Sequence, residues 1–379
     1  MPTKSMETMH LPAASLGTRR SLRVVRYGSG SFGRKATLQA GLHADEPPGF
    51  LVMHHLMNLL DGADRDNRIT SEIVLIPVAN PIGWDQWDHE TMQGRFETAS
   101  GVNFNREIPD LMEGTLARVR QELGADEREN RRLIVQAALD TLEEWVPSDE
   151  GAFLKKNLLS LSLDSDIVLD LHCDEKALFH MYTGTPLWPA MEDLALQTGA
   201  ALVLLAEDSG GSPYDEACSS LWWRLARELP GHSIPMACQA ATLELRGFGD
   251  ISHETALADA GNIYAFLQRR GFVEGEPPPL DAAPVEARPL EGVLYVKAPA
   301  PGVAVYLKEP GDRVLKGECV AHLVDPSAEG DRRVREIRST IDGLLFSTRI
   351  ARNVRTGMIL AKIAGKEPLE GKGAHLLTP

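Results

Sequence analysis

The sequence is poor in cysteine, has fewer basic than acidic residues and contains no long apolar run. Its four cysteines, Cys173, Cys218, Cys238 and Cys319, form no C-x-x-C pair and no disulfide-scaffold spacing, so we expect reduced thiols in a cytoplasmic protein. No apolar stretch approaches the roughly 20 residues that a membrane-spanning helix needs. The first 22 residues lack the apolar core of a secretion signal, and we predict a disordered leader over residues 1–20.

The charge balance is strongly negative. Lys and Arg number 39 against 54 Asp and Glu, which gives a formal net charge of -15. Such a surface repels phosphate backbones and anionic lipids, so it argues against nucleic-acid and membrane partners. An anionic substrate would therefore need a local cluster of arginines. The hydrophobic fraction of 43% is ordinary for a globular protein, and the length allows two domains.

The segment Gly-Leu-His-Ala-Asp-Glu-Pro-Pro-Gly at residues 41–49 lies between a strand-like run and a helix-like run. Two residues separate His43 from Glu46, so an imidazole and a carboxylate can reach one ion from a single turn, and Zn²⁺ accepts this pair of ligand types. A polar loop that caps a helix would also explain the pattern. His172 directly follows a second apolar run and is the natural third ligand. One such histidine would more often be a hydrogen-bonded core residue, but two histidines with Glu46 favour a metal site.

Strand-like and helix-like segments alternate along the first 275 residues. This alternation predicts an α/β fold with a mostly parallel sheet flanked by helices, and a ligand site beyond the carboxyl ends of its strands. His43, His172 and Glu244 all fall at such ends. The expected strands are residues 21–26 and 34–40, joined as a hairpin by the glycine-rich residues 28–33, and residues 72–78, 166–174, 177–182, 200–205 and 234–245. Helices are expected from about residue 47, as a helical hairpin over residues 111–145, and over residues 252–270.

The C-terminal part of the chain has a different character. After a catalytic domain over residues 1–275, a Pro-rich linker is predicted at 276–289, followed by a β-rich domain at 290–379. In this domain, residues 302–323 are echoed by residues 343–363, which predicts a small barrel that resembles the biotinyl/lipoyl-carrier barrel. Its connecting tip has no Met-Lys-Met motif. We therefore expect a structural, gating or oligomerising role, which leaves a homo-oligomer open.

Four motifs occur in a specific order along the chain. They are His43-x-x-Glu46, Asn105-Arg106, Leu171-His172 and Thr242-x-Glu244. Together they resemble the succinylglutamate desuccinylase/aspartoacylase family, whose members are related to the zinc carboxypeptidases. The appended β-rich domain resembles that family's too, so the match extends from about Gly41 to Ile363.

The resemblance implies a zinc carboxypeptidase-like fold with one Zn²⁺ per chain, bound by His43, Glu46 and His172. It also implies that Glu244 is the catalytic carboxylate. The pair Asn105 and Arg106 is implied to hold a carboxylate of the substrate.

Two departures from the family pattern affect the predicted site. Ala44 and Asp45 stand where many relatives have glycine, which leaves the ligands intact. The stretch between Asn80-Pro81 and Asn105 looks expanded, so the arginine that polarises the scissile carbonyl is harder to align. Arg95 is our candidate, and a surface arginine in a loop is the alternative.

The residues and the resemblance together predict a zinc-dependent hydrolase that cleaves the amide bond of a small N-acyl amino acid or a related carboxylate-bearing amide. A metallocarboxypeptidase acting on peptides and a non-catalytic zinc- or ligand-binding protein are the alternatives. Glu244 could instead pair with Arg246, whose side chain falls on the same side of a strand. Asp170 could orient the site or bond to the backbone. The tyrosines that could contact substrate are Tyr182, Tyr214 and Tyr295.

Overall fold

A nine-stranded mixed sheet forms the centre of the molecule. The computed structural model describes residues 3–28, 33–280, 285–373 and 375–377. In spatial order the strands are β1 (Ser5–His10), β2 (Ser21–Tyr27), β4 (Glu72–Ile76), β3 (Lys35–Ala40), β7 (Ile167–Asp174), β11 (Gln239–Gly247), β9 (His180–Gly184), β10 (Leu202–Ala206) and β12 (Ala287–Pro289). The pairs β4–β3, β3–β7, β7–β11, β9–β10 and β10–β12 are parallel, and the other three are antiparallel. The predicted α/β class with a mostly parallel sheet is confirmed.

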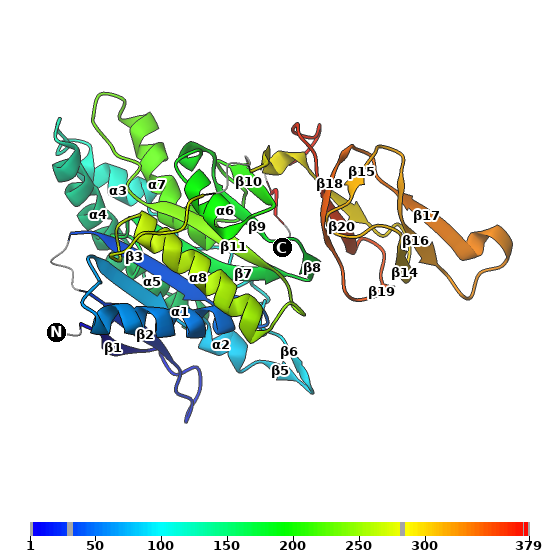
Figure 1. Ribbon diagram of the computed structural model, residues 1–379, viewed down its shortest axis with the longest axis horizontal. Helices are drawn as coiled ribbons and strands as arrows, with labels where there is room; N and C mark the ends of the chain where they lie inside the picture. The colour runs from blue at the N-terminus through cyan, green and yellow to red at the C-terminus, as the bar shows by residue number, and fades with distance from the viewer. Residues whose placement is uncertain (1–2, 29–32, 281–284, 374, 378–379) are drawn as a thin grey trace.

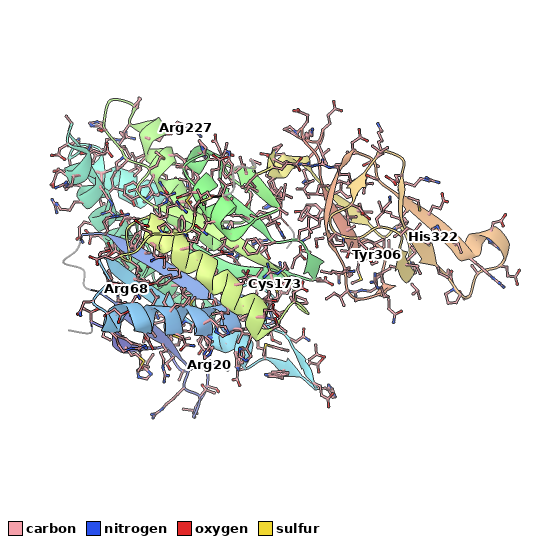
Figure 2. The ribbon with its side chains drawn as sticks, in the orientation of Figure 1. Arg20, Arg68, Cys173, Arg227, Tyr306 and His322 are labelled. Atoms are coloured by element: carbon pink, nitrogen blue, oxygen red, sulfur yellow. The ribbon has the colours of Figure 1, made fainter. Side chains whose placement is uncertain are left out.

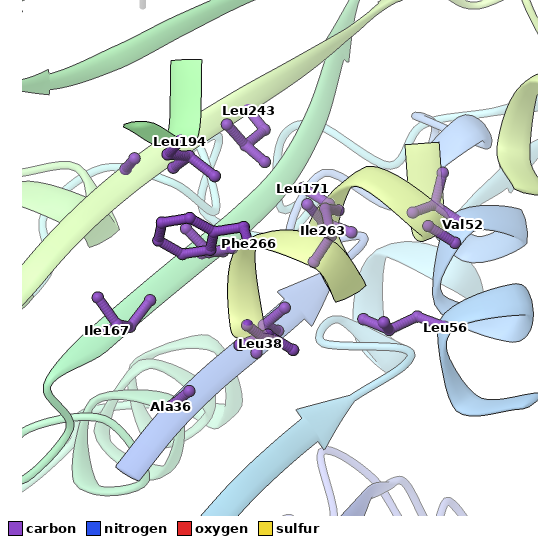
Figure 3. Close-up of a cluster of buried hydrophobic side chains, with 14 of the residues drawn as sticks. Ala36, Leu38, Val52, Leu56, Ile167, Leu171, Leu194, Leu243, Ile263 and Phe266 are labelled. Carbon is purple, nitrogen blue, oxygen red and sulfur yellow. The ribbon is translucent and has the colours of Figure 1, made fainter. Parts of the chain in front are cut away.

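Helices cover both faces of this sheet (Figure 1). One face carries α1 (Pro48–Arg65), α6 (Glu192–Thr198) and α8 (His253–Arg269), and the other carries α3 (Met112–Val119), α4 (Glu127–Glu144), α5 (Glu150–Ser160) and α7 (Tyr214–Glu228). In Figure 3, Leu56 of α1 and Phe266 of α8 lie over Leu38 of β3, and all three are fully buried. Each such side chain contributes roughly 1.5–3 kcal/mol by leaving water. The apolar clusters on the two faces of the sheet therefore hold the central strands, and the residues at the ends of those strands, in fixed positions.

Local sequence signals set the ends of two helices near the site. Pro48 occupies the first position of α1, where its missing N–H costs no hydrogen bond. The Ser252 hydroxyl accepts the backbone N–H of Thr255 at 3.0 Å and begins α8, in agreement with the helix predicted at 252–270.

The structure corrects several sequence predictions. Strands β2 and β3 do not form a hairpin, because β4 inserts between them and pairs with both; residues 29–32 of the predicted turn lie outside the described residues. Residues 5–10, expected within a disordered leader, form β1 against β2. Asn80-Pro81 opens a short helix, α2 (Pro81–Trp84), and the expanded stretch before Asn105 contains the hairpin β5 (Trp87–Asp88) and β6 (Thr91–Met92). The helical hairpin predicted at 111–145 is confirmed as α3 and α4.

The C-terminal segment forms two smaller sheets. One has the order β13 (Val293–Lys297), β20 (Ile359–Ala364), β18 (Gly343–Thr348) and β15 (Arg313–Val314), and the other β17 (Val334–Arg338), β16 (Cys319–Val324), β14 (Gly302–Tyr306) and β19 (Asn353–Val354). The predicted repeat is visible as β14–β15–β16 followed by β18–β19–β20. Among the described residues these strands do not close into one barrel, so the barrel is not confirmed. Short 3₁₀ turns lie at Thr185–Leu187, Leu290–Gly292 and Gly330–Arg333.

The C-terminal sheets lie beyond one end of the large sheet (Figure 1). The short strand β8 (Lys176–Ala177), which follows β7, pairs with β18, so the two parts share backbone hydrogen bonding. The last residues of the predicted linker form the edge strand β12. The domain boundaries remain predictions. Within the described ranges, no helix is both long and apolar enough to cross a membrane.

Candidate metal centre and active site

The loop at residues 41–49, here called the metal loop, connects β3 to α1. It begins at Gly41, whose φ of +75° favours glycine, and it brings His43 and Glu46 into one turn in which the Glu46 N–H donates to the His43 carbonyl at 3.2 Å. Both side chains are almost fully buried, with 3% and 2% of their surface exposed. The structure therefore places the two predicted ligands together.

His172, near the end of β7, joins the same cluster. Its Nδ1 lies 2.8 Å from Glu46 Oε2, and His43 Nδ1 lies 2.9 Å from Glu46 Oε1. One ligand atom from each of the three residues lies within 4.8 Å of the others. Two histidine nitrogens and a carboxylate oxygen are one of the sets of three protein ligands found in catalytic zinc sites.

The far nitrogen of each imidazole is held by a buried oxygen. His43 Nε2 lies 2.7 Å from Asn103 Oδ1, and His172 Nε2 lies 2.8 Å from Asp170 Oδ2. A histidine that donates its Nε2–H to such an oxygen presents an unprotonated Nδ1 to a metal. The donor set therefore fits a zinc ion. The sequence leaves the role of Asp170 open, and no sequence signal marks Asn103 except that it lies two residues before the Asn105-Arg106 motif.

The electrostatics of the cluster favour a cation. Burial opposes ionisation of Glu46, but His43 and His172 outweigh burial and hold the pKa of Glu46 well below its ordinary value. Burial and Arg95 lower the pKa of His43 to about 4, which keeps this imidazole in the neutral form that binds metals. Burial opposes protonation of His172, but Asp170 and Glu46 hold its pKa well above the usual value. The same negative surroundings would favour a metal at Nδ1 in place of a proton.

Glu244 reaches this cluster from the neighbouring strand. Strand β11 runs parallel to β7, with Glu244 opposite His172, and a bulge follows between Glu244 and Gly247. Bulges often redirect side chains beside active sites. The suggested partnership with Arg246 is wrong, because Arg246, at a φ of +66°, pairs with Asp259 of α8.

The Glu244 carboxyl is buried and has a strongly raised pKa. Its Oε2 is buried and has no hydrogen-bond partner among the described residues. Burial and the nearby Glu46 carboxylate raise the pKa of Glu244 to about 8. A buried carboxyl with a strongly raised pKa beside a metal site is typical of a catalytic acid or base.

The loop between α2 and α3 contributes the two predicted arginines. Gly94 packs against the metal loop so closely that a Cβ there would lie 2.2 Å from the Asp45 nitrogen, and its carbonyl accepts the Ala44 N–H at 3.1 Å. The next residue, Arg95, donates from Nη1 to Glu46 Oε1 at 3.1 Å. Arg95 is thus part of the cluster, in contrast to the surface arginine that was the alternative.

Asn105 and Arg106 lie farther along the same loop and line the same pocket as Arg95. Arg106 donates from Nη1 to the Asn105 carbonyl at 2.7 Å, and Asn105 Oδ1 accepts the backbone N–H of Tyr214 at 2.8 Å. Burial and Arg95 lower the pKa of Arg106 from its very high ordinary value. Two guanidinium groups in one pocket form the local positive cluster that an anionic group requires in this acidic protein.

One pocket is lined by both histidines, Glu244 and the two arginines. His43, His172 and Glu244 line it, and residues of the C-terminal segment form another wall, namely Leu290, Tyr295, Lys362 and Leu377. Lys362 Nζ pairs with Asp174 Oδ2 at 2.5 Å. Lys362 could not be predicted from the sequence, because nothing local links β20 to β7.

Of the three tyrosines considered from the sequence, Tyr182 and Tyr295 line the pocket. Tyr214 instead is buried in the core, where its hydroxyl lies 2.5 Å from Ser162 Oγ and donates to the Leu158 carbonyl. Its role is therefore structural, apart from the backbone N–H that holds Asn105.

A second cluster of possible ligand groups, Cys319, His322 and Glu336, lies in the C-terminal segment. Figure 2 labels His322, which lies in the sheet away from the large one. This cluster is partly exposed, and Glu336 already pairs with Arg338. The buried cluster at the pocket is therefore the better candidate for a catalytic metal.

Comparison with known proteins gives a consistent result. Residues 32–269 match the model of the succinylglutamate desuccinylase/aspartoacylase catalytic domain. The chain is 24% identical over 345 residues to an N-alpha-acetyl-L-2,4-diaminobutyric acid deacetylase from Halomonas elongata, covering 90% of this chain and 84% of that protein.

Two solved structures share the fold over nearly the whole chain. A succinylglutamate desuccinylase/aspartoacylase family protein from Shewanella amazonensis has a TM-score of 0.82 and 27% identity, and a protein described in the same terms from Shewanella frigidimarina has a TM-score of 0.84 and 24% identity. Each match covers 96% of this chain and 98% of the other. With the family model matching well over half of its length, the chain belongs to the succinylglutamate desuccinylase/aspartoacylase family.

Proposed function

We propose that the protein is a zinc-dependent deacylase that cleaves the amide bond of a small N-acyl amino acid. One observation carries the proposal: His43, Glu46 and His172 form a buried cluster of metal-ligand side chains beside a pocket that is also lined by Glu244, a buried carboxyl whose Oε2 lacks a partner among the described residues. Membership of a deacylase family supports it. The name of the Halomonas elongata relative, a deacetylase of an N-acetyl amino acid, agrees with this reaction class.

In this proposal His43, Glu46 and His172 would hold the zinc ion. When bound, zinc would supply Lewis acidity toward the scissile carbonyl and toward a water molecule. Asn103 and Asp170 position the two imidazoles through their Nε2 atoms. The protein thereby fixes both tautomers before any substrate arrives.

Glu244 acts as the general base and then as the general acid. Its carboxylate takes a proton from the attacking water and delivers it to the leaving amine, which departs as a free amine while the acyl group becomes a carboxylic acid. The buried setting suits the second half of this cycle, because burial favours the protonated carboxyl.

The two arginines stabilise different negative charges, one on the reacting carbonyl oxygen and one on the substrate carboxylate. Arg95, beside Glu46, stabilises the oxyanion that develops on the carbonyl oxygen. Arg106 binds a substrate carboxylate, for which a guanidinium offers two parallel hydrogen bonds, and the Asn105 amide nitrogen adds a donor. The pocket lining supports both roles, since all three side chains face the same space as His172.

The C-terminal wall favours a small substrate over a peptide. Tyr295, Lys362 and Leu377 form one wall of the pocket, whose cavity volume is about 60 Å³. A carboxypeptidase would need room for a chain on the leaving side of the scissile bond. The deacylase is therefore the better fit.

The test combines metal analysis with amine release. Purified protein is assayed for bound metal by elemental analysis and for amine release from N-acetyl, N-succinyl and related amino acids. We expect near one zinc per chain and chelator-sensitive release. Glu244→Gln should keep the zinc and lose roughly 10²- to 10⁴-fold in kcat.

Glu228→Gln, on the exposed end of α7, is the matched control and should behave as the wild type. Zinc without release from any substrate, or full activity in Glu244→Gln, would contradict the proposal. Release from peptides but not from acyl amino acids would establish the carboxypeptidase instead.

A further inference from the structure

We propose that Cys319, His322 and Glu336 form a second metal site, which binds Zn²⁺ or a similar divalent transition metal and ties β16 to β17. One ligand atom from each side chain lies within 4.8 Å of the others. Both strands belong to the smaller sheet away from the large one, where Figure 2 labels His322. None of the three residues lines the pocket described above. The inference therefore does not depend on the proposed deacylase function.

A bulge in β16 brings the cysteine and the histidine onto one face of the sheet. Residues three apart in a regular strand point to opposite faces. Strand β16, however, gains one residue against β17 between Cys319 and Ala321. The burial pattern agrees with this extra residue, because Val320 and Ala321 are both buried, whereas Cys319 and His322 on either side are partly exposed. The thiol and the imidazole therefore emerge on the same outer face.

Strand β17 supplies the third ligand. Glu336 lies directly opposite His322 in the antiparallel ladder, so the two side chains share a face. A thiolate sulfur, an imidazole nitrogen and a carboxylate oxygen are all ligands that zinc accepts, and the sulfur disfavours Ca²⁺ and Mg²⁺. Bonds from zinc to these atoms are about 2.0–2.3 Å long, so modest side-chain rotation lets all three reach one ion.

The thiol and the imidazole are available to a metal. Among the described residues, the His322 ring makes no hydrogen bond or ion pair. The Cys319 thiol has one weak contact, with Sγ 3.4 Å from the Ala321 carbonyl oxygen. Metal binding would release the thiol proton to solvent and would give the imidazole the partner that it lacks.

Glu336 already has a partner, Arg338, but this pair does not prevent metal binding. The two side chains are 50% and 52% exposed, and exposed ion pairs add little stability. Arg338 also donates from Nη1 to the Gly317 carbonyl at 2.7 Å, so it keeps a hydrogen bond when Glu336 turns to a metal.

The second copy of the internal repeat shows what is specific to this site. In β20, Ile359 and Lys362 correspond to Cys319 and His322, and β20 carries the same extra residue against β13. The bulge itself therefore belongs to the repeated unit. In β20 it directs Lys362 to Asp174, whereas in β16 both corresponding positions carry metal-ligand side chains. The repeat explains the bulge but not this choice of residues.

The proposed site should exchange its metal more readily than the buried cluster. Closed structural zinc sites usually have four protein ligands, whereas this one offers three at a partly exposed position and leaves a place for water. Binding also requires loss of the thiol proton, so it should weaken as pH falls. We expect the buried cluster to keep its metal through purification and the second site to fill when metal is added.

The test is a titration of the purified full-length protein with Co²⁺, followed by absorption spectroscopy. A cysteine thiolate bound to Co²⁺ gives a charge-transfer band in the near ultraviolet. The buried cluster of His43, Glu46 and His172 contains no cysteine, so this band reports on the second site alone. We expect the band to grow with added Co²⁺ and to saturate at one bound ion per chain.

Variants assign the band to the three side chains. Cys319→Ser should abolish it. His322→Ala should weaken Co²⁺ binding by at least about 10- to 100-fold, the loss that follows removal of even an outer partner of a metal ligand, and Glu336→Gln should weaken it by a smaller factor. Glu329→Gln, exposed between β16 and β17, is the matched control and should bind as the wild type does. No band in the wild type, or a band that survives Cys319→Ser, would overturn the inference.

Alkylation provides a second readout with Zn²⁺ itself. The other three cysteines are buried, so Cys319 is the thiol expected to react with iodoacetamide, which peptide mass spectrometry can verify. Zn²⁺ should slow this reaction in the wild type but not in His322→Ala, and a rate that Zn²⁺ does not change would refute the site. Neither readout uses amine release, which Cys319→Ser should leave unchanged, so failure of the deacylase function would be distinguishable.

Discussion

Lys362→Met should destabilise the protein strongly, because it removes one partner of a buried ion pair. Lys362 of β20 bonds to Asp174 at the end of β7, with Nζ 2.5 Å from Oδ2, and the two side chains are only 19% and 11% exposed. Methionine keeps most of the apolar stem, so the change isolates the charge. What remains is a buried carboxylate without its cation.

The pKa of Asp174 sets the scale of this effect. Burial alone would raise it, but Lys362, assisted by His180, holds it at about 2 against an ordinary value of 3.8. Lowering the pKa of Asp174 from 3.8 to about 2 corresponds to roughly 2.5 kcal/mol of stability. Measured losses on breaking buried pairs are typically about 3–5 kcal/mol. We therefore expect Lys362→Met to lower the free energy of unfolding by roughly 2–5 kcal/mol at pH 7.

Urea unfolding of the wild type and variant across pH provides the assay. Because the pKa of Asp174 is lower in the folded state, its contribution is present above the ordinary pKa near 3.8 and is lost as pH falls toward 2. The difference in the free energy of unfolding between the two proteins should be largest above about pH 5 and should disappear as pH falls toward 2.

Lys176→Met is the control, since Lys176 pairs with Glu309 across the same junction, but on the surface, with 46% and 63% of the side chains exposed. It should cost less than about 1 kcal/mol. A loss from Lys362→Met no larger than the control's, or a gap that does not change with pH, would refute the reasoning.

Three further predictions concern the site. Asp170→Asn should weaken zinc binding about 10- to 100-fold, as shown by competition with a chromogenic chelator, because His172 loses the carboxylate that orients it; unchanged affinity would make the contact incidental. Arg95→Met should lower kcat roughly 10²- to 10³-fold with little change in KM, and a normal kcat would remove Arg95 from oxyanion stabilisation. Arg106→Met should instead raise KM for carboxylate-bearing substrates by roughly 10- to 100-fold, and would be contradicted if an amide-capped analogue suffered equally.

Much of the fold follows from short-range patterns. Continuous apolar runs of strand length predict buried parallel strands, and polar residues directly after them meet at one edge of the sheet. His43, His172 and Glu244 could be grouped on this basis, and the register of β7 with β11 places the last two side by side. The prediction of a β2–β3 hairpin was wrong because the position of β4 depends on long-range pairing, which no local pattern encodes.

The remaining parts of the site depend on contacts between distant segments. Tyr295 and Lys362 line the pocket in a fold where β18 pairs with β8, and the sequence gives no sign of that pairing. Asp215 and Glu216 lie in the first turn of α7, where acidic residues are common, and only the structure shows that they line the pocket. Sequence patterns therefore identified the proposed metal ligands and Glu244 more readily than the other residues that line the pocket.

The pairing of β8 with β18 separates two tasks along the chain. Strands β3, β7 and β11 carry the groups proposed for hydrolysis, whereas β13 and β20, more than a hundred residues later than β7, supply a wall of the same pocket. Substitutions in those late strands that keep the Lys362–Asp174 pair can change which molecules enter without altering the proposed hydrolytic groups. Evolution, or an engineer exchanging C-terminal segments between relatives, can thus alter substrate choice and chemistry independently.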